Sequence, residues 1–326
     1  MSEVIEASLR IFTKGGFRLR LPATSANLGA AFDAAAVALD FALELDAKSA
    51  DAFSIQATGR NAEQCGRIEG NLILDTYTAL LGREGRIAPP LALRMHNQIP
   101  LGMGCGSSAA GRLAAVAMAA YFGELPWSGE RILAEACALE GHPDNAAACW
   151  MGGLVIAASE AGLPGSPMAV HAAQVKPPES WSALLAMPAR PLATSHARAV
   201  LPEGYSRADA VANVQAAALL GLAFAQCRGD LLAPAMRDRM HQPYRAEICP
   251  LLAPLLPLAG RDGVLGVALS GAGPSVLLVI EGERPRQAVS AALGEAGFAV
   301  GQQVELLDAG FATSGASADW RRMRTG

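Results

Sequence analysis

The sequence predicts an α+β protein of two domains. In the first half of the 326-residue chain, strand-like segments with alternating apolar residues are interleaved with helix-like ones, which predicts a mixed sheet covered by helices. In the second half the elements follow the order β-α-β-β-α-β, which is typical of a ferredoxin-like domain. Residues 161–180, AGLPGSPMAVHAAQVKPPES, concentrate Pro, Gly and Ser between the two halves. We therefore predict an N-terminal domain over 1–170 and a C-terminal domain over 171–326.

The elements of the first half follow from apolar periodicity and from the positions of Gly and Pro. Residues 17–29 predict a strand that runs into a loop, and the Ala-rich residues 30–39 follow as a helix-like piece. Further along the chain we expect a strand-like stretch at 43–59, a helix at 71–85, a strand at 90–96, helices at 109–121 and 130–139, and a helix, Gly-Gly break and strand within 146–159.

The second half begins with a predicted strand at 181–188. Residues 206–258 are mostly helical, with breaks at Pro234, Pro243 and Pro250, because proline cannot continue a helix interior. The last elements are two strands around a Gly-rich turn at 264–282, a helix at 284–297 and a strand at 299–308. This order predicts the split βαβ arrangement with an enlarged first helical part.

Composition and charge exclude several function classes. With 52% hydrophobic and 17% charged residues the chain can bury a substantial core. A net charge of -4 gives no basic footprint for nucleic acid. The apolar stretches are interrupted before the roughly 18 residues that cross a bilayer, so we expect no membrane span. The acidic start, MSEVIEASLR, does not resemble an export signal, and we expect a cytoplasmic protein.

The six cysteines show neither CxxC pairing nor the spacing of metal ligands. They stand at positions 65, 105, 137, 149, 227 and 249. We expect buried, free thiols in a reducing compartment.

A glycine-rich stretch, NQIPLGMGCGSSAAGRLAAVAMAAYFG at 97–123, predicts an anion-binding loop that opens into a buried helix. Glycines let backbone N–H groups turn toward a phosphate, and a helix N-terminus adds about half a positive charge. Ser107 and Ser108 can cap this helix. No lysine follows the glycines, and no Val-Ala-Ile-Lys strand is present, so the P-loop and the protein-kinase site are excluded.

Residues 104–109 also match the G-x-G-x-x-A dinucleotide fingerprint, which makes an oxidoreductase the remote alternative. A dinucleotide-binding unit needs a second parallel strand soon after the helix. Residues 123–141 instead lead into another helix, which argues against this alternative.

The stretch PLGMGCGSSAAGRLAA at 100–115 is similar to the P-x-x-x-G-L-G-S-S-A-A loop of the GHMP small-molecule kinases. Two further motifs of that superfamily, LPATSANLGAAFD at 21–33 and LSGAGPSVLLV at 269–279, stand in the same order. Within it, PATSANLG followed by Phe32-Asp33 resembles the homoserine kinases. So do EGHPDNAAACWMGGL, LATSHARAVLP and DRMHQPYR, which begin at residues 140, 192 and 238.

The resemblance implies a two-domain GHMP kinase fold. Its N-terminal domain would be like domain 2 of ribosomal protein S5, and its C-terminal domain ferredoxin-like. It implies ATP- and Mg²⁺-dependent phosphorylation of L-homoserine to O-phospho-L-homoserine in threonine biosynthesis. A GHMP-type kinase for another small hydroxylated metabolite is the alternative. It further implies a small-molecule substrate, and we also expect a homodimer.

The resemblance also assigns residues to the nucleotide and its metal. Ser108 and Glu140 would bind Mg²⁺, since this hard cation takes oxygen ligands and one or two carboxylates beside ATP. Asn71 would contact the adenine side, and a helix N-cap is the alternative. The residues that would hold the ATP phosphates are Pro100, Leu101, Gly102, Met103, Gly104, Cys105, Gly106, Ser107, Ser108, Ala109 and Ala110.

Homoserine carries an ammonium, a carboxylate and a hydroxyl, and the resemblance supplies a partner for each. Asp33 and Asn27 would face the amino and hydroxyl end. Arg198 and Arg245 would bind the carboxylate, to which the guanidinium fork is suited. The further contacts are Thr194, His142 and Asn145, with Gly271 and Gly273 letting backbone approach the ligands.

The catalytic base stays open. Several superfamily members carry an Asp where Asn145 stands here, and Asn cannot accept the proton. The resemblance implies catalysis by alignment and charge stabilisation, while Asp144 or Asp33 remain alternatives. The usual Gly-Pro-Gly-Phe-Asp is Gly-Ala-Ala-Phe-Asp at 29–33, and this loss of two turn-forming residues predicts a small shift of the substrate loop. In addition, Cys105 stands where a leucine is common.

Overall fold

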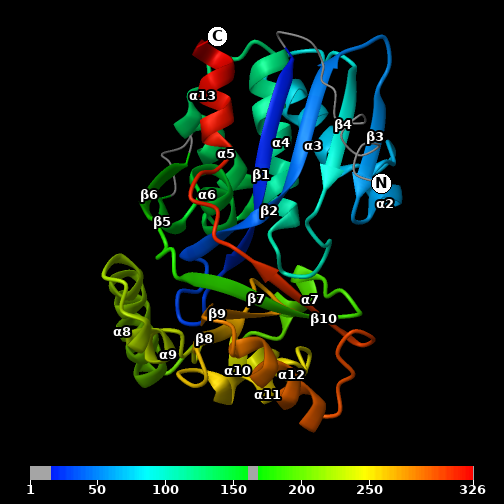
Figure 1. The fold of residues 1–326 in the computed structure, drawn as a ribbon. Helices are drawn as coiled ribbons and strands as arrows, with labels where there is room; N and C mark the ends of the chain where they lie inside the picture. Colours follow the sequence, from blue (N-terminus) through cyan, green and yellow to red (C-terminus); the bar gives the residue numbers. More distant parts are fainter. Residues whose placement is uncertain (1–15, 161–167, 326) are drawn as a thin grey trace.

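A computed structural model describes residues 16–160 and 168–325 of the chain, which form two sheets, one above the other in Figure 1. The first sheet has six strands in the order β3-β4-β2-β5-β6, with β1 paired to β2. Its pairs are antiparallel except for β3 and β4. The strands are β1 (Phe17–Ala26), β2 (Ala35–Ser49), β3 (Ser54–Gly59), β4 (Leu91–Asn97), β5 (Leu154–Glu160) and β6 (Ala169–Val175).

The helices of this half pack around α4, the predicted buried helix. Its residues from Ala109 to Ala120 are buried apart from Arg112, and it contacts α3, α5 and β1. A helix apolar on nearly every side requires such a covering. The helices are α2 (Ala62–Cys65), α3 (Leu72–Arg83), α4 (Ser107–Phe122), α5 (Gly129–Glu140) and α6 (Asp144–Met151). Because α5 and not a strand follows α4, the dinucleotide-binding alternative is wrong.

The second sheet has four antiparallel strands in the order β10-β7-β9-β8, so the predicted ferredoxin-like arrangement is confirmed. The strands are β7 (Trp181–Pro188), β8 (Val264–Leu269), β9 (Val276–Glu281) and β10 (Val304–Ala309). The helices are α7 (Thr194–Ala199), α8 (Arg207–Ala225), α9 (Leu232–Ala235), α10 (Gln242–Arg245), α11 (Leu252–Leu255) and α12 (Pro285–Glu295), with 3₁₀ turns at Gly229–Leu231 and Leu256–Leu258.

Two segments differ from the sequence prediction. The helix-like piece at 30–39 is a turn followed by the start of β2, which lies between β1 and β5 and beneath α6. This part of β2 is buried on both faces, so its apolar run carries no strand alternation and its alanines suggest a helix. Strand β6 lies inside the predicted linker 161–180, of which residues 161–167 are outside the described residues. The boundary at 170 stays a prediction.

The end of the chain returns to the first sheet. Helix α13 (Ser317–Thr325) packs beside β1, and the backbone N–H of Arg20 donates to the Asp319 carboxylate at 2.9 Å. In Figure 1 this red helix stands next to the blue strand. The two halves are therefore joined by a returning segment as well as by the chain between β6 and β7.

Most, but not all, of the thiols follow the sequence prediction. All six cysteines are free, and four of them are buried. Cys227 is exposed and Cys65 is half-buried, so burial was wrongly predicted for these two.

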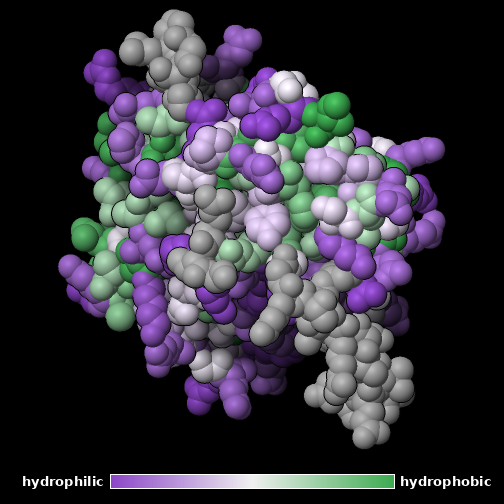
Figure 2. All heavy atoms as spheres, turned by 90° about the horizontal axis from the view of Figure 1, so that it is seen from above, coloured by the Kyte–Doolittle hydropathy of each residue, from purple (hydrophilic) through white to green (hydrophobic). Residues whose placement is uncertain are grey.

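One described helix, α8, is long and apolar enough by length and composition to cross a membrane. It exposes Val211, Val214 and Leu222 but also packs against α9 and β6, and a single such helix is weak evidence for a membrane protein. Viewed from the end of the molecule at the top of Figure 1, hydrophilic and hydrophobic residues are interspersed over the visible surface (Figure 2).

Candidate active site

The loop between β4 and α4 is built of left-handed glycines. Gly102, Gly104 and Gly106 have φ of 70°, 75° and 71°. A Cβ on Gly104 would lie 2.1 Å from the Ser270 carbonyl oxygen, and one on Gly106 would lie 1.9 Å from Thr24 Oγ1. Only glycine fits these positions, because both the φ angle and the space exclude a side chain.

Helix α4 begins at this loop without a side-chain cap. Its N-cap is Gly106, and neither serine caps it, so the predicted capping role of Ser107 and Ser108 is wrong. The Ser108 hydroxyl donates to Glu140 instead, at 2.8 Å. The first turn thus presents its N–H groups and the positive end of the helix dipole, the two features that bind a phosphate.

Two pockets meet at Ser107 and Ser108. A polar pocket of about 90 Å³ lies toward the C-terminal sheet, and an apolar pocket of about 290 Å³ lies toward α3. The polar pocket brings together these predicted residues: Asn27, Asp33, Gly104, Gly106, Ser107, Ser108, Ala109, Glu140, His142, Asn145, Thr194, Arg198, Arg245 and Gly271. The apolar pocket is lined by the predicted Asn71, Leu101, Ser107, Ser108 and Ala110.

Asn71 stands at the N-terminus of α3, which forms one wall of the apolar pocket. Its Oδ1 accepts from the N–H groups of Ile73 and Leu74 at 3.1 and 3.4 Å. Its Nδ2 donates to the carbonyls of Cys65 and Arg67. The N-cap alternative is therefore confirmed, and a contact with adenine stays a prediction.

Several predicted loop residues lie outside both pockets. Pro100, Gly102, Met103 and Cys105 line neither of them, and Cys105 is buried, which raises the pKa of its thiol to about 12. Gly273 also lies outside: a Cβ there would be 2.6 Å from Cys249 Sγ. The roles predicted for these residues stay predictions.

A hydroxyl and a carboxylate lie side by side where the two pockets meet. Glu140, the last residue of α5, accepts from Ser108 Oγ and from Arg112 Nη1, both at 2.8 Å. Its side chain is 7% exposed, and Arg112 also reaches the Leu139 carbonyl. Hard oxygen donors of this kind at a phosphate-binding loop suit Mg²⁺.

Opposite this pair, charged groups converge on the Phe32 ring. Arg198 forms a bidentate ion pair with Asp33, with distances of 2.8 and 3.0 Å. The guanidinium carbons of Arg198 and Arg245 lie 5.6 and 5.5 Å from the Phe32 ring centroid, within the range of cation–π contacts. Both arginines thus contact the same aromatic ring. Arg198 is also paired with Asp33, the carboxylate that we predict to bind the substrate ammonium.

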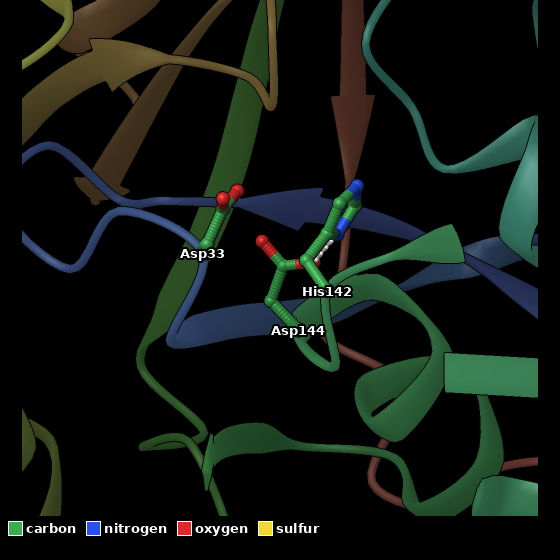
Figure 3. A group of neighbouring side chains, drawn as sticks. All are labelled: Asp33, His142 and Asp144. Atoms are coloured by element: carbon green, nitrogen blue, oxygen red, sulfur yellow. Dashed lines mark hydrogen bonds and ion pairs between the residues drawn. The ribbon is translucent and has the colours of Figure 1, made fainter. Parts of the chain in front are cut away.

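His142 and Asp144 complete the polar pocket, and in Figure 3 the Asp144 carboxylate lies between Asp33 and the His142 ring. His142 Nδ1 lies 2.6 Å from Asp144 Oδ1. Burial opposes a charge on His142, but the hydrogen bond and the charge of Asp144 outweigh it and raise its pKa. The ligand atoms of the three residues lie within 4.8 Å of one another, and Arg198 supplies the positive charge facing Asp33.

Asn145 is fixed by its neighbours. Its Oδ1 accepts from Thr24 Oγ1 at 2.7 Å, and its backbone N–H donates to Asp144 at 2.6 Å. A neutral amide in this position orients a hydroxyl but accepts no proton.

The loop after β1 is held in an unusual backbone conformation. Asn27, Leu28 and Asp33 have positive φ, and Asn27 is buried, donating from Nδ2 to Gly271 O and accepting from the Asp33 N–H. Ala30 and Ala31 do not have positive φ, so glycine is not required there.

Both halves of the chain match known protein families. Residues 71–153 match the family described as GHMP kinases N terminal domain, and residues 223–299 match GHMP kinases C terminal. Homoserine kinases of Solibacter usitatus and Deinococcus radiodurans are 44% and 38% identical to this chain. The alignments cover 81% and 80% of this chain and 85% and 83% of those proteins. The chain belongs to the homoserine kinase family of GHMP kinases.

A solved structure supports the fold of this GHMP kinase. A homoserine kinase from Cytophaga hutchinsonii superposes with a TM-score of 0.73 at 22% identity, over 94% of this chain and 98% of that one. The predicted two-domain α+β GHMP kinase fold is therefore confirmed.

Sequence reasoning missed the groups that support the predicted ones in this GHMP kinase. Thr24 holds Asn145, Arg112 holds Glu140, and the Phe32 ring contacts both arginines. Thr24 and Phe32 stand within the quoted motif at 21–33 and Arg112 within that at 100–115, but only the fold shows what these residues contact.

Proposed function

We propose that this kinase transfers the γ-phosphoryl group of ATP to the side-chain hydroxyl of L-homoserine, giving O-phospho-L-homoserine for threonine biosynthesis. The observation that carries the proposal is the polar pocket. It brings together two arginines and Asp33 with the Ser108–Glu140 pair, which joins the start of α4 to the end of α5. An amino acid with a terminal hydroxyl matches this combination of charged groups with a phosphate site.

ATP would occupy the loop and the apolar pocket. The phosphates would lie against the backbone N–H groups from Gly104 to Ser108, and the base in the pocket beside α3, whose lining is mainly apolar. Phosphoryl transfer depends on positioning and charge neutralisation, which backbone dipoles supply without reorganisation.

Ser108 Oγ and the Glu140 carboxylate would hold Mg²⁺. Their hydrogen bond holds the two oxygens next to each other, and hydroxyl and carboxylate oxygens are both ligands that this cation accepts. The ion, when bound, neutralises charge on the phosphate oxygens. Arg112 then keeps the carboxylate of Glu140 oriented.

Homoserine would separate an existing ion pair and bind both of its members. Its ammonium would meet Asp33, and its carboxylate would meet Arg198 and Arg245, replacing the bidentate contact between Asp33 and Arg198. Thr194 and His142 line the same pocket as further contacts.

We assign no residue as the general base. Asn145 is an amide, Asp33 faces Arg198, and Asp144 is bonded to His142 and to the Asn145 N–H. The hydroxyl proton would pass to solvent or to a phosphate oxygen, and alignment with charge stabilisation would carry the rate.

A cytoplasmic location and a homodimer complete the proposal. The exposed apolar residues Val211, Val214 and Leu222 of α8 are the kind of surface that a second protein chain covers. Light scattering after size exclusion measures the mass directly, and a monomer at all concentrations would refute the dimer.

The test of the reaction is ADP release measured side by side with homoserine, threonine, serine, mevalonate and shikimate. We expect homoserine to have the highest kcat/KM, with O-phosphohomoserine as the product in ³¹P NMR. If mevalonate or another alcohol exceeds homoserine tenfold, the chain is a GHMP kinase for a different hydroxylated metabolite.

A further inference from the structure

One buried residue beneath the arginines has no part in the proposed reaction. His241, immediately before α10, is 0% exposed and stacks on Phe32 with ring centroids 5.2 Å apart. It stands four residues before Arg245, which is also buried. A fully buried imidazole needs a partner for each ring nitrogen.

The partners of the two ring nitrogens determine where the proton is. Nε2 lies 2.8 Å from the Gly29 carbonyl oxygen, which can only accept, so Nε2 carries the proton. Nδ1 lies 3.1 Å from Arg245 Nη1, which can only donate, so Nδ1 is unprotonated. The ring is therefore neutral. Burial and the charge of Arg245 lower the pKa of His241, and the Asp238 carboxylate, 3.6 Å from Nε2, opposes this shift without reversing it.

Arg245 depends on this acceptor. Its Nε donates to the Ala197 carbonyl at 2.9 Å and its Nη1 to His241, while Nη2 is engaged by neither. Burial and the nearby charge of Arg198 both disfavour the charged guanidinium and lower the pKa of Arg245. Without fixed acceptors it would turn away from Arg198 toward a better-solvated position.

His241 is itself fixed to the substrate loop. The Asp238 carboxylate accepts from the N–H groups of Met240, His241 and Gln242 and from Asn213 Nδ2. Asn213 Nδ2 also lies 3.1 Å from the Ala30 carbonyl. A Cβ on Gly29 would meet Met236 O at 1.9 Å, so the loop and this segment are in close contact.

We infer that His241 is a positioning residue for recognition of the substrate carboxylate: its neutral imidazole holds the Arg245 guanidinium in place at the polar pocket, which Arg245 lines. The inference rests on the proposed function and deepens it. It predicts that the position of one ring nitrogen, rather than the presence of a ring, determines the affinity for the carboxylate.

Two amide substitutions separate the two contacts. In His241→Asn the side-chain oxygen can take the place of Nδ1 and accept from Arg245. In His241→Gln the amide nitrogen can take the place of Nε2 and donate to Gly29. We expect His241→Gln and His241→Ala to raise the KM for homoserine about tenfold or more, since a hydrogen bond to a charged group is lost. His241→Asn should recover most of that loss, while kcat and the KM for ATP change little.

The same substitutions at His171, which is exposed on β6, are the matched controls and should leave all constants unchanged. Combining His241→Gln with Arg245→Ala tests whether His241 acts through the arginine. The double variant should have the homoserine KM of Arg245→Ala alone. This comparison stays valid if His241→Ala does not fold, and thermal unfolding identifies that case.

Equal KM increases in the Asn and Gln variants, or additive effects in the double variant, would overturn the inference and leave a packing role. Homoserinol, which lacks the carboxylate, gives a second check. His241→Gln should not weaken its use beyond that of the wild type, and a tenfold loss there would also refute the inference. If the wild-type enzyme releases no ADP with homoserine, the proposed function fails instead.

Discussion

The polar pocket is lined by two groups of residues that come from different parts of the chain. The phosphate side consists of backbone: Gly104, Gly106 and the uncapped start of α4. The substrate side consists of charged side chains from distant segments, including Asp33, Arg198 and Arg245. Phosphate recognition is therefore contained in one contiguous motif, whereas recognition of the amino acid exists only after folding. Changes on the phosphate side should alter a different kinetic constant from changes on the substrate side.

The largest effect is expected where the pockets meet. Glu140→Ala and Ser108→Ala should each lower kcat by about 10²–10³, or about 2.7–4 kcal/mol, by analogy with removing one group that stabilises transition-state charge. The KM for homoserine should stay nearly constant, because neither side chain is assigned to the amino acid. Steady-state kinetics over a Mg²⁺ titration measures both constants.

Glu69→Ala is a suitable control, since Glu69 is exposed and lines neither pocket. Near-normal turnover by Glu140→Ala would show that the metal ligand lies elsewhere and would contradict the assignment of Glu140 to Mg²⁺.

On the substrate side the effect should be smaller and confined to binding. Arg198→Ala and Arg245→Ala should raise the KM for homoserine by tens-fold, taking a charge-assisted hydrogen bond as about 1.5–3 kcal/mol. The effect should appear in this KM more than in kcat, because the carboxylate is equally charged in the ground and transition states. The KM for ATP should change little, because neither arginine is assigned to the nucleotide. Lysine should rescue Arg198 only in part, since a point charge cannot replace the bidentate fork.

Homoserinol provides the control for this pair. Wild type and both alanine variants should use it about equally poorly. A further tenfold loss on homoserinol would show that the arginine serves the phosphates or the fold.

The smallest effect is expected at the far wall of the apolar pocket. Asn71→Ala removes the N-cap of α3 and should lower the free energy of unfolding by about 1 kcal/mol. Ser128→Ala, which removes the side-chain cap of α5, should cost a similar amount in denaturant titration. A rise of more than tenfold in the KM for ATP by Asn71→Ala, absent in Ser128→Ala, would show direct contact with the nucleotide.

The same contrast explains what the sequence predicted. The glycine loop, the buried helix α4 and the ferredoxin-like order were predictable, because each depends on local spacing and turn residues. Asn71 as an N-cap was also predictable from its position before an apolar helix. The start of β2 was not, because a strand buried on both faces has no alternation to detect. The partners of Asp33 and Asn145 lie 165 and 121 residues away, so no local pattern reports them.

The ion pair between Asp33 and Arg198 has a consequence for small molecules that carry only one of the two charges of an amino acid. A zwitterion separates this pair but gives each partner a new counter-ion. A simple amine or a simple hydroxy acid would satisfy one partner and leave the other without a counter-charge beside the Phe32 ring. The closed pair therefore acts as a competitor that only a ligand with both charges displaces without loss, and the enzyme should use amino alcohols and hydroxy acids much more poorly than the amino acid.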